Sequence, residues 1–334
     1  MRMLRVDSTA SRSAGALSSG QRRRLLAGAL LPWVLGACGD RKEPMRLVGQ
    51  PWPAYEPMFL ARTLGYMPPG VELQESNTGQ ESIQLIYDGR VDGVMLTLDE
   101  VLRLRDQGVA LQIVLVFDVS RGADMLLARP GMRDLAALRN QRVGVEDSTL
   151  GALMLTLILE KAGLQRKDVS VQPIPYDEHE TAWDRNYIDA LITYEPLAGR
   201  LLARGARLLL STRQLPDTIF DVLAMRSEVL DRHADGLRAC LAAYFKALTY
   251  LRQNPWDVAY RVAPRLQVSA EGLIDSLRGL ELPDRIGNLS YLAGTDSALL
   301  KAVHRLSPIL QQAGLLQKPV NTERLLSSLY LPTS

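Results

Sequence analysis

The chain has 334 residues, of which 47% are hydrophobic and 23% are charged. These fractions are typical of a soluble globular protein and exclude collagen-like, mucin-like and largely disordered chains. The 39 Lys and Arg residues nearly balance the 37 Asp and Glu residues, but residues 1–37 hold six of the arginines and one of the aspartates. The remaining chain is weakly acidic, which excludes the clustered basic surface that nucleic-acid binding requires.

An apolar segment near the start predicts an export signal. Three consecutive arginines, residues 22–24, precede a thirteen-residue apolar run, residues 25–37, and Cys38 follows it. Because a membrane-spanning helix needs about 20 apolar residues, this run is too short to be a permanent anchor. Residues 1–37 are therefore predicted to be a signal peptide. The paired arginines are typical of twin-arginine export, and an ordinary secretory signal fits them as well.

The motif LGAC at residues 35–38 resembles the bacterial lipobox, in which the cysteine is acylated and the bond before it is cut. This resemblance implies a lipid on Cys38, with residues 38–44 as the tether. Since each buried CH₂ group adds about 0.8 kcal/mol of membrane affinity, several acyl chains hold a protein on a membrane without a spanning helix. The alternative is a soluble signal peptide cut after Ala37, with Cys38 incidental.

Short apolar strands alternate with helices in the next part of the chain. The predicted strands are residues 45–52, 71–76, 93–96 and 111–119. Helices are predicted at residues 56–67, at residues 82–92 and from Asp99 onward. This alternation predicts a parallel or mixed sheet that is covered by helices on both faces.

A second run of strands and helices begins near residue 125. Its predicted strands are residues 125–128, 142–145, 168–175, 188–194 and 206–212, and an apolar stretch follows at residues 220–226. From Ser227 onward the pattern is almost wholly helical, with helices predicted at residues 238–251, 258–262, 270–277 and 297–313. The sequence therefore predicts two α/β lobes followed by a helical tail.

Several sequence pieces carry a resemblance to a known family. GRVDG at residues 89–93 lies where a helix gives way to a strand, and LAALRNQRVGV at residues 135–145 opens the second run. Together with the lipobox, FDVSRGAD at residues 117–124 and ITYEPLA at residues 192–198, they closely resemble one group of periplasmic solute-binding proteins. This is the nitrate, sulfonate, taurine and pyrimidine-precursor group, and the resemblance runs from about residue 45 to residue 226.

The resemblance implies a bilobed α/β periplasmic-binding-protein fold, type II-like, that closes around its ligand by hinge motion. Lobe one is expected to comprise residues 45–126 plus residues 221–334, which include the tail, and lobe two residues 127–220. The implied role is that of a periplasmic, lipid-anchored, monomeric binding protein that delivers a small solute to an ABC permease and its ATPase. No cofactor, metal or enzymatic activity is expected.

Candidate ligand groups lie at strand ends, because ligands of open α/β sheets bind beyond the carboxyl ends of strands. The candidates are Trp52, Tyr55, Asn77, Thr78, Gly79, Thr97, Asp99, Asp118, Ser120, Ser148, Thr149, Tyr194, Glu195 and Asp221. Several have a plainer alternative role. Asn77 to Gly79, Asp99 and Ser148 could simply cap helices, and one of the two aromatic residues Trp52 and Tyr55 could pack against loops.

The candidates point to two kinds of ligand chemistry. A helix that begins at Ser148 or Thr149 favours an anionic group such as a sulfonate or carboxylate. Asp118, Glu195 and Asp221 favour an amine or ring nitrogens instead. A zwitterion or an aromatic nitrogen heterocycle would satisfy both, and stacking on Trp52 or Tyr55 slightly favours a heterocyclic or amino-bearing solute.

Other functional classes have little support in the sequence. The three histidines lack metal-ligand spacing, and no nucleophile elbow, phosphate loop or dinucleotide fingerprint occurs. Fungal pyrimidine-precursor synthases share the expected fold but carry a cysteine-rich motif, whereas this chain has only Cys240 after Cys38. The alternative to transport is a membrane-tethered sensor that presents its ligand to a receptor.

Overall fold

The computed structural model of the protein describes residues 43–333. The predicted signal peptide, residues 1–37, and the predicted lipid site, Cys38, lie outside the described residues. Within residues 43–333, no helix combines the length and the apolar character that crossing a bilayer requires.

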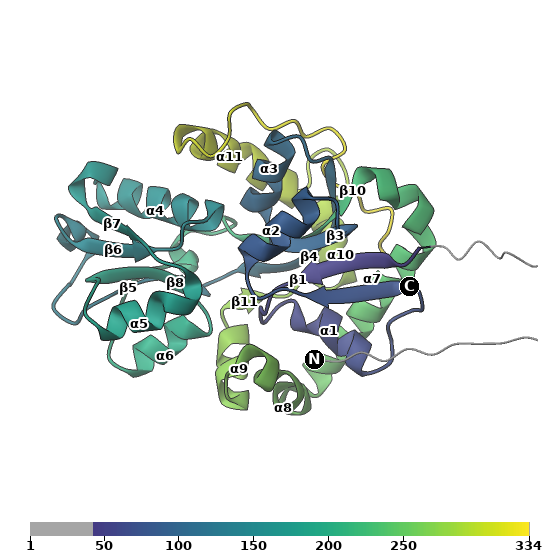
Figure 1. Ribbon diagram of the computed structural model, residues 1–334, viewed down its shortest axis with the longest axis horizontal. Helices are drawn as coiled ribbons and strands as arrows, with labels where there is room; N and C mark the ends of the chain where they lie inside the picture. The colour runs from purple at the N-terminus through teal and green to yellow at the C-terminus, as the bar shows by residue number, and fades with distance from the viewer. Residues whose placement is uncertain (1–42, 334) are drawn as a thin grey trace, which may run out of the picture. The chain divides into compact units, whose positions relative to one another are not determined.

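Six strands form the first sheet, in the order β11, β4, β10, β3, β1, β2 (Figure 1). The bounds are β1 Met45–Gly49, β2 Val71–Glu75, β3 Gly93–Thr97, β4 Leu111–Ser120, β10 Phe220–Arg226 and β11 Leu280–Glu281. Strands β1, β2 and β3 are parallel, and β10 runs antiparallel to both β3 and β4. The carboxyl ends of β1 to β4 therefore meet at one edge of the sheet, where β10 begins.

Three short helices follow the first three strands. They are α1 Glu56–Thr63, α2 Gly79–Tyr87 and α3 Leu98–Asp106. The central strands β3, β4 and β10 are buried along almost their whole length, since helices pack on both faces of the sheet. This mixed sheet is the one that the strand and helix alternation predicts.

Five strands form the second sheet, in the order β7, β6, β8, β5, β9. The bounds are β5 Asp124–Ala128, β6 Arg142–Val145, β7 Ser170–Pro173, β8 Ala190–Tyr194 and β9 Arg207–Ser211. The covering helices are α4 Thr149–Ala162, α5 His179–Asp184 and α6 Leu197–Ala203. Strand β6 is parallel to β7 and β8, whereas β5 is antiparallel to β8 and β9. Hence β6 and β8 end at the edge where β5 begins.

The chain passes between the two sheets twice. It leaves the first sheet after Ser120 and enters the second at Asp124, with Gly122 at a φ of 129° in the short connection. It returns between Ser211 and Phe220. The expected boundary at residue 126 lies inside β5, because the hydrogen-bonded register with β8 already starts at Asp124.

The remaining chain is mainly helical, as its pattern predicts. Its helices are α7 Leu230–Gln253, α8 Pro255–Leu266, α9 Ala270–Leu277, α10 Arg285–Leu292 and α11 Ala298–Gln312. The break between α7 and α8 falls at Asn254 and Pro255, where the sequence predicts it. Helix α7 packs on α1, α10 packs on β4, and Leu326 bridges to Ile113 of β4. The tail therefore packs mainly on elements of the first sheet.

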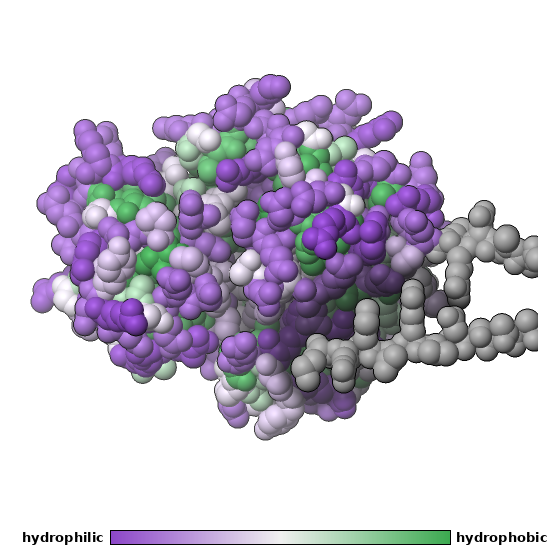
Figure 2. All heavy atoms as spheres, in the orientation of Figure 1, coloured by the Kyte–Doolittle hydropathy of each residue, from purple (hydrophilic) through white to green (hydrophobic). Residues whose placement is uncertain are grey.

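The visible surface is mostly hydrophilic, with hydrophobic residues in small separate patches (Figure 2). The hydrophobic residues otherwise form a large core around the first sheet and a smaller cluster in the second. Trp183, Ile188, Leu191 and Leu201 belong to the smaller cluster.

Candidate functional site

A cavity of about 410 Å³ opens where the strand ends of the two sheets meet. The first sheet and its connections supply Gln50, Pro51, Trp52, Asn77, Thr78, Gly79, Gln80, Thr97, Glu100, Ile219 and Asp221. The second sheet supplies Asp124, Glu146, Asp147, Ser148, Leu150, Tyr176, Asp177, Glu180, Tyr194, Glu195, Pro196, Leu197 and Arg200. Helix α8 and the residue after it add Arg265, Leu266 and Gln267.

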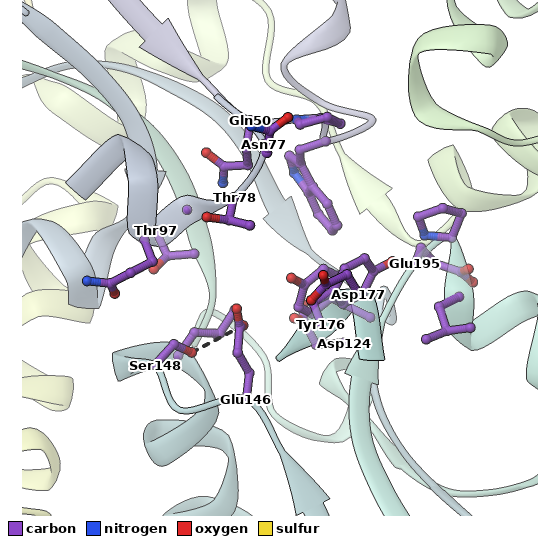
Figure 3. A pocket seen from close by; sticks show the side chains of 18 of the residues that line it. Gln50, Asn77, Thr78, Thr97, Asp124, Glu146, Ser148, Tyr176, Asp177 and Glu195 are labelled. Atoms are coloured by element: carbon purple, nitrogen blue, oxygen red, sulfur yellow. Dashed lines mark hydrogen bonds between the residues drawn. The ribbon is translucent and has the colours of Figure 1, made fainter. Parts of the chain in front are cut away.

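Nine of the fourteen predicted ligand residues line this cavity. They are Trp52, Asn77, Thr78, Gly79, Thr97, Ser148, Tyr194, Glu195 and Asp221. The strand registers explain their convergence, since Asp221 of β10 lies opposite Thr97 of β3, and Asp124 of β5 lies opposite Tyr194 of β8. Figure 3 shows labelled members of both groups, among them Thr78, Thr97 and Ser148, around one open space.

Three other predicted residues form a buried layer behind the cavity wall. Tyr55 is fully buried and donates its hydroxyl hydrogen to Asp221. Asp118 is also fully buried, and its Oδ2 accepts a hydrogen bond of 3.0 Å from Trp52 Nε1. The Ser120 hydroxyl lies 2.7 Å from that of Thr212. These side chains support residues of the wall and do not line it.

The last two predicted residues lie on the first turns of helices. Asp99 is buried beneath the first turn of α3. The hydroxyl of Thr149 accepts a hydrogen bond of 3.1 Å from Arg103, which links α4 to α3. Neither residue lines the cavity, because the helix turns its next side chain away from the strand ends.

Several lining residues were not predicted, and each has a reason. Asp124 opens an antiparallel strand, so a search of strand carboxyl ends passes over it. Glu146 directly follows β6, and Glu100 lies three residues into the region after β3, so both were within reach of the strand-end rule. Tyr176 lies in a polar connection, and Arg265 comes from the distant helical tail. Nothing in the local sequence indicates that these two reach the site.

Three aromatic rings share the cavity wall. Trp52 and Tyr194 meet edge to face with ring centroids 5.7 Å apart. Tyr176 lies parallel to Tyr194 at a centroid distance of 4.3 Å. Because the Trp52 indole is also held by Asp118, its orientation is fixed before any ligand arrives. The rings offer a rigid apolar surface on which a planar or cationic group can pack.

The cavity wall is strongly acidic. Its carboxyl side chains are Glu100, Asp124, Glu146, Asp147, Asp177, Glu180, Glu195 and Asp221. Its basic side chains are Arg200 and Arg265, and both are ion-paired: Arg200 with Glu180, and Arg265 with Glu56 and Glu75. The described wall therefore holds no basic side chain that lacks a carboxylate partner.

Burial raises the pKa values of these carboxyl groups, because a low-dielectric site disfavours the charged form. It raises the pKa of Asp124 to about 6, with a hydrogen bond from Ser120 opposing and the charge of Glu195 adding to the rise. Burial, with the neighbouring charge of Glu100, raises the pKa of Glu146 to about 7. Behind the wall, burial raises the pKa of Asp118 to about 8.

The helix starts at the cavity are already satisfied by the protein's own groups. Thr78 caps α2 by accepting from the Glu81 amide, and Ser148 caps α4 by accepting from the Gly151 amide at 3.0 Å. The Ser148 hydroxyl also donates to Glu146 at 3.3 Å. The predicted capping alternative is thus observed for Thr78 and Ser148.

Among the described residues, no group of three or more His, Cys, Asp or Glu side chains has the arrangement of a metal site. The cysteine in this part of the chain, Cys240, is fully buried against the sulfur atoms of Met58 and Met67. It lies outside the cavity wall.

Comparison with known proteins agrees with this architecture. A family model described as the NMT1-like family matches residues 40–263. A Brucella abortus protein that carries the general name of a binding protein is 26% identical over 155 residues. That match covers 45% of this chain and 49% of the relative, so the chain spans about half the length of the curated relatives it matches.

Solved structures share the fold at low sequence identity. The aliphatic sulphonate-binding protein SsuA from Escherichia coli has a TM-score of 0.70 and 17% identity, over 86% of this chain and 99% of that chain. SsuA from Xanthomonas axonopodis pv. citri, bound to MOPS, has a TM-score of 0.69 and 17% identity, over 83% and 96%. The desulfurization enzyme DSZB has a TM-score of 0.63 and 18% identity, over 86% and 97%.

These likenesses confirm the predicted bilobed periplasmic-binding-protein fold, with one sheet in each lobe. The predicted resemblance to this group is confirmed as well. Since the family match spans more than half of the chain, the protein belongs to the NMT1-like family.

Proposed function

We propose that this protein is the solute-binding lipoprotein of an ABC importer. The observation that carries the proposal is the cavity of about 410 Å³ that strand ends of both lobes build together. Its volume lies in the range of about 300–1,000 Å³ that is usual for small-molecule sites. A solute held there contacts both lobes, so binding is coupled to their closure, and a permease can recognise the closed form.

The placement in the cell rests on the start of the sequence and on the structural relatives. A signal peptide at residues 1–37 would export the chain, and a lipid on Cys38 would tether it at the periplasmic side of a membrane. The two SsuA proteins are named as a periplasmic aliphatic sulphonate-binding and an alkanesulfonate-binding protein. The partners proposed here are a small solute, an ABC permease and its ATPase, with the protein acting as a monomer.

The candidate solutes are a sulfonate or taurine, nitrate, and a nitrogen heterocycle such as a pyrimidine precursor. A thermal-shift screen of the purified chain against these solutes and small amines tests the proposal. A solute at 100 times its Kd stabilises the folded state by about 2.7 kcal/mol. For a chain of this size we expect the melting temperature to rise by roughly 5 °C or more.

Matched variants show whether a solute binds in the proposed cavity. Trp52 lines the cavity, whereas Trp256 is exposed on α8 and lies outside it. Trp52→Ala should reduce the shift, and Trp256→Ala should leave it unchanged. Equal shifts in both variants would place binding elsewhere and contradict the proposal.

Catalysis is the second candidate, because the fold of DSZB is also similar. One DSZB structure holds biphenyl-2-sulfinic acid, which that enzyme's name associates with desulfurization. Incubating the purified chain with biphenyl-2-sulfinic acid and measuring released sulfite tests this alternative. Release above the uncatalysed rate would favour an enzyme over a transport subunit. A solute that binds in a cell lacking an associated permease would instead favour the sensor role.

A further inference from the structure

Asp124 is a buried carboxylate in the cavity wall with an unused oxygen. Its side chain is 3% exposed, and Oδ2 has no hydrogen-bond partner among the described residues. It opens β5 directly opposite Tyr194, at the edge where strands of both lobes converge. Figure 3 places Asp124 beside the open space, across from Thr78 and Thr97. A buried acceptor without a donor is costly, so its retention in the wall calls for a donor from outside the chain.

Carboxylates from both lobes share this space with Asp124. Glu100 lies on α3 of the first lobe, and Glu146 follows β6 of the second. Glu100 and Glu146 repel one another, and the phenol of Tyr194 experiences the charges of Glu146, Glu100 and Asp124 together. The negative charges therefore converge around one ring instead of being spread over the wall.

Each helix that starts at the cavity already carries its own carboxylate. Glu81 accepts a hydrogen bond of 2.7 Å from the amide of Asn77 before α2. Glu100 accepts one of 3.0 Å from the amide of Thr97 before α3. Glu146 receives the hydroxyl of Ser148 before α4. An anionic ligand group would have to compete with these carboxylates, and both lining arginines are ion-paired as well.

Aromatic rings adjoin the same carboxylates. Trp52 and Tyr194 meet at 5.7 Å, and Tyr176 stacks on Tyr194 at 4.3 Å. The faces of tryptophan and tyrosine rings attract cations through their quadrupole. Carboxylates beside ring faces make an environment that favours a positively charged organic group and disfavours a sulfonate or nitrate.

We propose that the cavity recognises its solute through a positively charged nitrogen, a protonated amine, quaternary ammonium or protonated ring nitrogen, that pairs with Asp124 beside Trp52 and Tyr194. This inference rests on the proposed function and narrows its solute to organic cations. The unpaired Oδ2 accepts the N–H of a protonated nitrogen, or faces the charge of a quaternary one. Glu100 and Glu146 supply the surrounding negative potential from the two lobes.

The test compares organic cations with uncharged molecules of the same shape. Isothermal titration of the full purified chain uses choline against 3,3-dimethyl-1-butanol, and benzylammonium against benzyl alcohol. Ethanesulfonate and nitrate serve as anionic probes. We expect at least one cation to bind at least about tenfold more tightly than its neutral counterpart, and the anions to bind more weakly than that cation.

Variants then locate the recognition. Asp124→Asn keeps the size of the side chain and removes its charge, so we expect it to weaken binding of the cation by at least about tenfold. Asp235→Asn removes an exposed carboxylate on α7 that pairs with Arg238, and should leave the affinity unchanged. Asp124→Glu restores the charge and should recover part of the affinity. Circular dichroism spectra of all variants check that they are folded.

Three outcomes would overturn the inference. Tight binding of ethanesulfonate or nitrate with no binding of cations would overturn it while leaving the solute-binding function in place. Cation binding that Asp124→Asn does not weaken would remove Asp124 from the recognition. Failure of every cation to bind would overturn the proposed solute class, whereas the solute-binding function itself fails only if the wider thermal-shift screen is also negative.

Discussion

Asp124 is placed as a group whose charge serves binding at the expense of stability. Burial raises its pKa to about 6, so the side chain is ionised at pH 8 although nothing among the described residues pairs with Oδ2. Asp124→Asn removes this charge. We expect the unliganded variant to be more stable than the wild type at pH 8 by roughly 1 kcal/mol or more, and about equally stable at pH 5, where the wild-type aspartate is protonated.

Thermal unfolding of both proteins at the two pH values measures this difference. A variant that melts lower at both pH values would show that Asp124 has a structural role, because a neutral amide then fails to replace an interaction that the fold needs. A higher melting temperature combined with weaker binding is the opposite pattern, which is common at functional sites.

Asp118 acts on the ligand through Trp52. Its Oδ2 accepts the indole N–H at 3.0 Å, in a place where both side chains are buried. Asp118→Ala leaves that N–H without a partner and frees the ring to turn, so we expect the affinity for a bound cation to fall by about tenfold. Asp118→Asn keeps an oxygen acceptor and should retain most of the affinity. Titration of both variants measures the contrast, and equal losses would mean that the charge of Asp118, not its acceptor, matters.

At the scale of elements, the helix starts separate a capping role from a binding role. Ser148 caps α4, and Ser269 caps α9 with the same geometry, each accepting at 3.0 Å from the amide three residues later. Replacing either serine by alanine should lower the free energy of unfolding by about 1 kcal/mol. Because Ser148 also faces Glu146, its loss should not reduce cation affinity more than about twofold.

Denaturant unfolding and ligand titration of Ser148→Ala and Ser269→Ala measure both effects. If only Ser148→Ala abolished binding, the start of α4 would be a ligand site as the sequence suggests, and an anionic group would become the better candidate for it. Equal stability losses with unchanged affinity would identify both serines as caps.

The sequence predicts the elements better than it predicts the site. Periodicity locates the strands and the break at Pro255, because burial on both faces leaves continuous apolar runs. The strand-end rule brings Trp52 and Tyr194 to the cavity, since they follow or end parallel strands. It misses Asp124, which opens an antiparallel strand, and it includes Asp118, whose side chain is buried behind Trp52. Direction and facing of a strand are tertiary facts that a local pattern does not contain.

For the whole molecule, the site exists only because segments distant in sequence converge. Asp221 returns from the second lobe to lie between Thr97 and Asp118 in the first sheet. Arg265 reaches the wall from the tail and is held there by Glu56 and Glu75. Such long-range contacts have no sequence signal in a single chain. The alternation of strands and helices nonetheless limits the fold to two covered sheets, and a cleft between them follows from that topology.

The concentration of buried carboxyl groups at the cleft predicts how stability of the whole chain depends on pH. Burial raises the pKa of Glu100 and of Glu146 to about 7, and that of Asp118 to about 8. In the unfolded chain these groups lose their protons near pH 4. Between about pH 4 and pH 8 the folded state therefore binds more protons than the unfolded state, so stability falls as the pH rises.

We expect the unliganded chain to melt at least about 5 °C lower at pH 8 than at pH 5, in buffers of equal ionic strength. A bound organic cation stabilises the ionised carboxylates, so the melting-temperature shift that it produces should grow from pH 5 to pH 8. Asp235→Asn should show the wild-type dependence, because that carboxylate is exposed. A melting temperature that is flat or rises from pH 5 to pH 8 would contradict the ionisation pattern. A cation shift that shrinks over the same range would mean that the carboxylates are not the groups facing the ligand's charge.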